Sequence, residues 1–160
     1  MAPYYYSPLL SSSHIRVIKI AHDDTSPDAP LRCTIHQIEL SEEDPPVYSA
    51  LSYTWGSNAD TQPLLCANEG RPDAVRELRI TTNLAEALRV VIEKGPSQNV
   101  STAWDWEDKE KRVQEIEEPP KEQDFYLWVD QICINQGDDD ERAAQVGMMD
   151  LIYRRMSSIL

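Results

Sequence analysis

The chain lacks any apolar run long enough to span a bilayer, and its N-terminus lacks the cationic-then-apolar order of a secretory signal. Basic residues are scarce: 15 Lys and Arg stand against 28 Asp and Glu, which gives a formal net charge of −13. Nucleic acid and anionic membranes both attract proteins through clustered positive charge. We therefore expect neither of them as a partner, and no membrane span.

Cysteine is also sparse. Cys33, Cys66 and Cys133 form an odd and widely spaced set, which fits a reducing compartment better than a disulfide framework. The three histidines do not show the paired spacing with cysteine that zinc sites use. The sequence also has no glycine-rich phosphate loop and no Gly-x-Ser-x-Gly elbow. These absences predict a cytoplasmic protein with no metal and no resident cofactor.

What is present suits one domain with a real core, because the chain has 160 residues of which 41% are hydrophobic. Residues 15–20 and 31–40 alternate apolar and polar positions and predict an N-terminal β-hairpin addition. A change of parity within 31–40 suggests a β-bulge or a bend. Residues 47–54 predict a central strand. Residues 64–66 and 77–81 flank a polar turn and could form a peripheral hairpin.

The second half predicts helices around a buried strand. Asn83 is the expected N-cap of a helix that Gly95 ends, with Glu86 completing a capping box. Residues 105–124 are rich in charge and predict a flexible insertion. Residues 125–134 then read as a buried parallel strand. A helix over 142–156 follows, with a buried stripe at its helical spacing; the stripe comprises Val146, Met149, Tyr153 and Met156.

Polar residues interrupt or end both central strands, and each has two readings. Trp55 and Gly56 form either a ligand-contacting loop or a plug and turn at the sheet edge. Asp130 lies in an apolar run, so it either carries a functional charge or is satisfied by a neighbouring Arg or hydroxyl. Asn135 and Gln136 either cap a turn or bind a ligand's polar edge, and capping is favoured for Asn135.

The remaining polar residues of this region have simpler roles. Glu141 complements the dipole of the following helix, and Arg142 pairs locally. Gln145 suits either a structural or a binding role. Cys133 paired with His36 could suggest a thiol nucleophile and its base, but Cys133 sits inside apolar sequence, where thiols are usually inert.

Three blocks of the sequence together resemble the fungal heterokaryon-incompatibility (HET) domain. They are residues 48–56 (YSALSYTWG), residues 82–84 with Ala87 and Leu88, and residues 127–136 (LWVDQICINQ) followed by Glu141-Arg142, Gln145-Val146, Met149 and Ile152-Tyr153. The resemblance runs in order over residues 15–160. Its motif residues, taken as candidate binding residues, are Ser52, Tyr53, Trp55, Gly56, Asn83, Asp130, Cys133, Asn135, Gln136, Glu141, Arg142 and Gln145.

The HET domain is itself distantly similar to Toll/interleukin-1-receptor (TIR) domains. That likeness implies a flavodoxin-like α/β fold with a mostly parallel sheet flanked by helices. In it, the strand ending in Ser52 and the strand over 127–134 are neighbours whose ends meet at one rim. Some TIR domains cleave NAD with a glutamate on a later helix, which would fall beyond Leu160. The resemblance therefore supplies no catalytic residue here.

The resemblance implies a role in nonself recognition between fused fungal cells, with a cell-death response. The first hypothesis is a signalling module that acts by self-association or partner binding. The second is an NAD-binding or NAD-cleaving domain, the one case in which a cofactor is expected. The third is an inactive remnant. Ile159 and Leu160 look like the start of a further strand, so we expect a single domain over 1–160, incomplete at its C-terminus.

Overall fold

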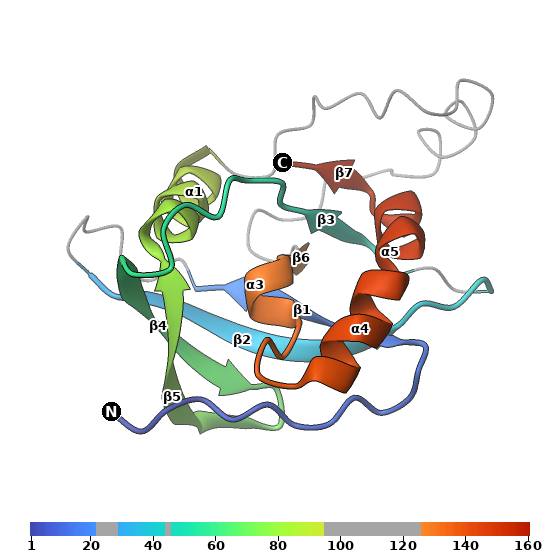
Figure 1. Ribbon diagram of the computed structural model, residues 1–160, viewed down its shortest axis with the longest axis horizontal. Helices are drawn as coiled ribbons and strands as arrows, with labels where there is room; N and C mark the ends of the chain where they lie inside the picture. Colours follow the sequence, from blue (N-terminus) through green and yellow to red (C-terminus); the bar gives the residue numbers. More distant parts are fainter. Residues whose placement is uncertain (22–28, 44–45, 95–125) are drawn as a thin grey trace.

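A computed structural model describes residues 1–21, 29–43, 46–94 and 126–160. The described part forms an α/β domain built on one seven-stranded sheet (Figure 1). Its elements in chain order are β1 (His14–Ile20), β2 (Leu31–Glu39), β3 (Tyr48–Ala50), β4 (Thr61–Asn68), β5 (Arg71–Thr81), α1 (Thr82–Lys94), β6 (Tyr126–Trp128), α3 (Asp130–Cys133), α4 (Asp139–Gly147), α5 (Met149–Arg155) and β7 (Ser158–Ile159). The predicted insertion over 105–124 lies outside the described residues.

The α/β class is confirmed, but the predicted mostly parallel sheet is wrong. The strand order is β5-β4-β2-β1-β6-β3-β7. Three of these pairings are parallel (β2 with β4, β3 with β6, β3 with β7) and three are antiparallel. The N-terminal hairpin is the reason, since β1 and β2 occupy the middle of the sheet. The two strands pair with each other, and each has a second neighbour from another part of the chain: β6 beside β1, and β4 beside β2.

Strand β1 is buried on both faces, as its central position requires. Ile15, Val17 and Ile18 are fully buried, and so is Arg16, at 1% exposure. The register with β2 runs without interruption from His14 opposite Glu39 to Ile20 opposite Cys33. The bulge predicted within 31–40 is therefore wrong. In β2, Leu31, Cys33 and Ile35 are buried on one face, whereas Ile38 on the other face is half-buried, and no extra residue is inserted.

The two strands that were expected to be long are short. The strand predicted over 47–54 comprises only Tyr48–Ala50, and the one predicted over 125–134 ends at Trp128. After Val129 the backbone makes a single helical turn, α3, whose Ile132 and Cys133 are buried. An apolar run of this length is compatible with a buried strand or a buried helical turn, and periodicity does not separate them.

Helix α1 begins one residue before the expected cap. Its N-cap is Thr81, whose hydroxyl accepts a hydrogen bond from the backbone N–H of Leu84 at 3.3 Å. Asn83 lies inside the first turn, so the predicted Asn83–Glu86 capping box is wrong. The apolar face of the helix is as predicted, with Leu84 and Leu88 fully buried in the core.

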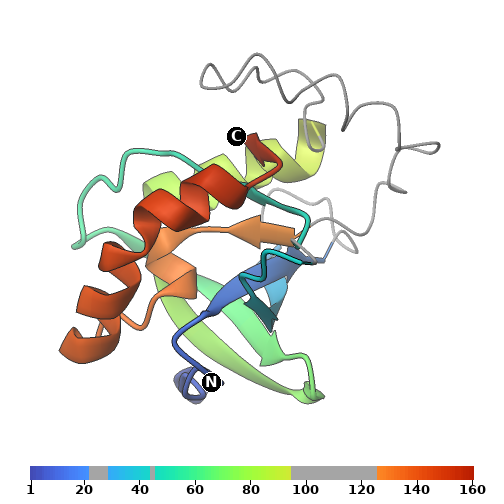
Figure 2. The same cartoon turned by 90° about the vertical axis from the view of Figure 1, so that its right-hand side faces the viewer.

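The helix predicted over 142–156 is two helices. Chain direction changes at Met148, which ends α4 and precedes α5, and Figure 2 shows the bend between them. The change of phase breaks the predicted stripe: Val146 is 54% exposed, whereas Gln145 is buried at 2% and Ile152 at 0%. The strand expected to begin at the end of the chain is present as β7, parallel to β3.

Two longer-range features complete the architecture. The predicted peripheral hairpin is confirmed and longer than expected, because β4 and β5 pair along most of their length and β5 is the sheet's edge. The N-terminal segment runs past β5 toward α4 (Figure 1). Its Pro3 forms an isolated β-bridge with Glu77 of β5. Among the described helices, none combines the length and the apolar character needed to cross a membrane.

Candidate functional site at the ends of β3 and β6

The predicted rim exists, because β3 and β6 are parallel neighbours and the chain leaves both at the same edge of the sheet. Ala50 pairs with Trp128, and the next N–H, that of Leu51, donates to the Trp128 carbonyl at 2.9 Å. Beyond this point the chain after β3 and the start of α3 converge on Asp130. The carboxyl ends of parallel strands are where α/β proteins commonly place their sites.

Asp130 is the meeting point of this rim. Its Oδ2 accepts the indole N–H of Trp55 at 2.9 Å, and its Oδ1 accepts the Tyr53 hydroxyl at 3.3 Å. Oδ1 also accepts the N–H of Gln131 at 2.7 Å. Burial, and then the Asp130 charge, raises the pKa of Tyr53, which keeps the hydroxyl protonated and able to donate. The carboxylate is thus satisfied by neutral donors, one of the two readings of its place in the sequence.

Gly56 and Asn83, two further motif residues, are brought together by the same loop. Gly56 has φ of +71°, and a Cβ placed on it would lie 2.6 Å from Asn83 Nδ2. The Asn83 amide donates to the Thr54 carbonyl at 3.2 Å. Asn83 therefore holds the loop that carries Trp55 rather than capping a helix, and glycine is required at 56 for both conformation and space.

A second polar cluster lies behind the rim and centres on Arg16. Its guanidinium bonds Glu141 in a bidentate pair, with Nη1–Oε1 at 2.5 Å and Nη2–Oε2 at 3.0 Å. Arg16 also donates to the carbonyls of Cys133 and Ser7, and the Tyr6 ring stacks on it with its centroid 4.9 Å away. Sequence reasoning missed Arg16, although the same signal that singled out Asp130, a charge within an apolar strand, was there.

The motif residues after α3 act mainly on backbone. Glu141 Oε1 also accepts the N–H of Asn135 at 2.8 Å. The Asn135 side chain accepts from Gly137 N at 3.2 Å, so the favoured turn-capping role is confirmed. Gln136 donates to the Asp130 carbonyl at 3.0 Å. Arg142 pairs locally, as predicted, with Asp139 at 2.8 Å.

Three predicted site residues lie away from the rim's polar contacts. Ser52 is exposed, and its N–H donates to the Leu160 carbonyl at 3.0 Å. Gln145 is buried and donates to the His14 carbonyl at 3.3 Å. Cys133 is fully buried, and burial raises its pKa to about 12. A thiol with that pKa stays protonated at neutral pH, so Cys133 is structural.

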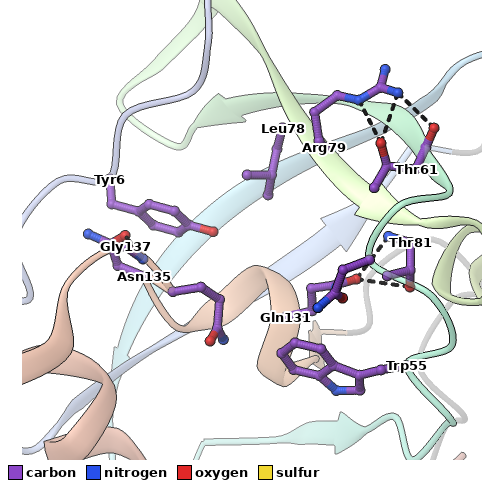
Figure 3. A pocket seen from close by; sticks show the side chains of 11 residues that line it. Tyr6, Trp55, Thr61, Leu78, Arg79, Thr81, Gln131, Asn135 and Gly137 are labelled. Carbon is purple, nitrogen blue, oxygen red and sulfur yellow. Dashed lines mark hydrogen bonds between the residues drawn. The ribbon is translucent and has the colours of Figure 1, made fainter.

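A cleft of about 340 Å³ opens beside the rim, between the N-terminal segment, β5 and the turn after α3. Figure 3 shows Tyr6, Leu78 and Trp55 around it, with the Arg79 guanidinium turned toward Thr61. Its lining residues are Tyr6, Trp55, Asn58, Thr61, Leu78, Arg79, Thr81, Gln131, Asn135, Gln136 and Gly137. Within the described part of the chain, His, Cys, Asp and Glu nowhere gather in a group of three that could hold a metal ion.

The fold and the rim define an α/β domain whose widely separated sequence blocks meet through polar contacts that are at least partly buried. Residues 109–160 match the sequence model of the family described as Heterokaryon incompatibility protein (HET). The chain is also 33% identical, over 145 residues, to Heterokaryon incompatibility protein 6, OR allele, of Neurospora crassa. Residues 109–160 therefore carry HET-domain sequence, and most of the chain is similar to a heterokaryon incompatibility protein.

The second of these matches covers 89% of this chain but 17% of the Neurospora protein, so the chain spans about a sixth of the relative that it matches. No solved structure matches the chain. The assignment therefore comes from sequence, and the TIR-like arrangement expected from the resemblance has no structural counterpart in these comparisons.

Proposed function

We propose that the chain is a signalling module of heterokaryon incompatibility, which responds to nonself by triggering cell death. It acts by self-association or partner binding through the rim formed by the loop after β3 and by α3. The HET-domain match of residues 109–160 and the similarity to a heterokaryon incompatibility protein support an incompatibility role. The proposal places the module in the cytoplasm, because that is where the contents of fused cells mix.

The observation that carries the proposal is the bond between Trp55 and Asp130. It joins the first and third motif blocks at one partly buried edge of the sheet, although 75 residues separate the two side chains in sequence. Trp55 is half-buried there, so part of its ring remains accessible. An aromatic ring held by a side-chain hydrogen bond at a surface is well suited to protein recognition, where Trp and Tyr supply much of the binding energy.

Expression of the chain in a filamentous fungus tests this proposal. The unaltered chain should reduce viability, and Trp55→Ala or Asp130→Ala should restore growth at equal protein level. Tyr5→Ala and Asp73→Ala are matched controls, because both residues are exposed and lie outside the rim. Undiminished killing by both rim variants would refute the role of the rim. A harmless unaltered chain would favour an inactive remnant.

A second candidate is the binding or cleavage of NAD at the same edge of the sheet. The cleft supports it, because Trp55 offers a stacking face and several amide side chains line the space. The family resemblance assigns no catalytic residue to residues 1–160. Incubation of the purified chain with NAD decides the matter: nicotinamide release above a heat-denatured control supports cleavage, and its absence removes that activity from this chain.

A further inference from the structure

The cleft beside the rim is nearly uncharged, which is unusual for a chain with a net charge of −13. None of its eleven lining residues is Asp or Glu, and the one charged residue is Arg79. Arg79 is already engaged: its Nη2 donates to the Thr61 carbonyl at 2.7 Å and to its hydroxyl at 2.9 Å, and Glu77 lies 3.4 Å from Nη1. The cleft therefore offers neither a strong anion site nor a strong cation site.

The side chains that line the cleft divide into an apolar surface and a set of amides. Leu78, Trp55 and Tyr6 supply the apolar surface. The side-chain oxygens of Gln131 and Asn135 each accept a hydrogen bond within the protein, and the side-chain NH2 of Gln136 donates one. Among the described residues, the other side of each amide has no partner in the protein. These groups can donate to and accept from a ligand that carries peptide bonds.

The cleft's composition matches the centre of a protein interface, where aromatic and apolar groups are surrounded by polar groups and charge is depleted. Its volume of about 340 Å³ is at the lower end of the range of roughly 300–1,000 Å³ for ligand sites. That is enough for one aromatic side chain and its two adjoining peptide units. Protein partners commonly anchor themselves through one such side chain in a pocket.

We propose that this cleft is the docking site for an uncharged peptide segment of a protein partner, anchored by one aromatic side chain. The inference rests on the proposed function, since it names the kind of partner that the rim engages. Charge complementarity selects the partner's chemistry. An acidic segment would be repelled by the acidic chain, and a basic segment would be drawn to exposed carboxylates, such as Asp139 and Asp140 at the start of α4, rather than to the cleft.

A set of near-isosteric probes tests the inference with the purified chain. N-acetylphenylalanine amide is neutral and carries the anchor between two amide groups. N-acetylphenylalanine is its anionic analogue, phenylalanine amide its cationic analogue, and N-acetylalanine amide lacks the ring. Titration is followed by two-dimensional NMR at the indole N–H of Trp55. The neutral aromatic probe should bind with a Kd on the order of 1 mM, as expected for a ligand of this size.

The other three probes should bind at least about fivefold more weakly, which corresponds to the loss of a good contact or the cost of a misplaced charge. Leu78→Ala should weaken the neutral probe by a similar factor. Val75→Ala is the matched control, because Val75 is a half-buried residue of the same strand that does not line the cleft. Urea denaturation of both variants reports whether each is folded.

Three outcomes would overturn the inference. The first is no shift of the Trp55 indole N–H signal at a concentration of neutral probe about tenfold above the expected Kd. The others are binding of the charged analogues as tight as that of the neutral probe, or the same effect of Leu78→Ala and Val75→Ala on binding. Any of them can occur while the rim variants still abolish killing in the fungal host. In that case the docking site is wrong and the proposed function stands. Conversely, if the neutral probe binds as expected but the unaltered chain does not kill the host, the docking site stands and the proposed function is wrong.

Discussion

The buried pair of Arg16 and Glu141 gives the most demanding prediction, because both its partners and its burial are known. The Arg16 side chain is 1% exposed and the Glu141 side chain 13%. Glu141→Gln keeps the shape of the residue but removes the charge, and leaves a buried guanidinium without its counter-ion. Breaking a buried pair in this way costs about 3–5 kcal/mol of unfolding free energy.

Glu141 also accepts the N–H of Asn135 and lies on the face of α4 that meets β1, so relaxation toward solvent is restricted. Urea denaturation measures the effect. With a slope of about 2 kcal/mol per M for a small domain, the midpoint should fall by roughly 2 M with the slope unchanged. The reference is Asp139→Asn, two residues before Glu141, where an exposed pair with Arg142 should contribute less than about 1 kcal/mol.

A double variant separates the charge from the packing. Arg16→Met with Glu141→Leu replaces both charges by apolar groups, and such replacements are often neutral or stabilising. We expect it to recover at least half of the stability lost by Glu141→Gln. If Glu141→Gln costs no more than Asp139→Asn, or the double variant is the least stable of all, the reasoning from a desolvated charge is refuted.

Other changes test the loop, the thiol and the helix phase. Gly56→Ala should cost about 1–3 kcal/mol, because φ is +71° and the new Cβ would meet Asn83 Nδ2 at 2.6 Å, whereas Gly70→Ala, with no atom within 4 Å, should cost less than about 1 kcal/mol by urea midpoint. Cys133 should resist iodoacetamide at pH 8 in the folded chain, since burial raises its pKa to about 12 and little thiolate is present below that pH; rapid alkylation seen by intact mass would contradict this. Val146→Lys should leave stability within about 0.5 kcal/mol, because the side chain is 54% exposed; a larger loss would mean that the residue is buried as the sequence pattern suggested.

The sequence was sufficient for the parts of the fold that depend on local apolar pattern and on the motif order. The hairpin of β4 and β5, the apolar face of α1 and the parallel pairing of β3 with β6 were all predicted. The strand order was not, because periodicity shows which residues are buried but not which strand lies beside which. The placement of β1 and β2 at the centre depends on pairings with segments more than 30 residues away.

Predictions of which residues are buried failed where a polar residue faces the core. The helical spacing of apolar residues predicted that Val146 is buried. The inward face of α4 instead carries Glu141 and Gln145, one turn apart. Both meet β1, the first through Arg16 and the second through the His14 carbonyl. A helix can hide polar groups when the opposing strand supplies partners, and no single-helix pattern contains that information.

The same contacts explain why the family motif is spread over the chain. Trp55 with Asp130 and Arg16 with Glu141 join residues 75 and 125 positions apart. The first bond ends on α3 and the second on α4, and Arg16 and Glu141 also bond the backbone of Cys133 and Asn135 at the end of α3. Polar contacts of this kind are directional, and the loss of one partner leaves the other group partly or fully desolvated. Several of the motif residues therefore fix the relative position of β1, the loop after β3, and α4. A recognition rim needs such a fixed framework, because an aromatic contact held rigidly loses less conformational entropy on binding than one on a free loop.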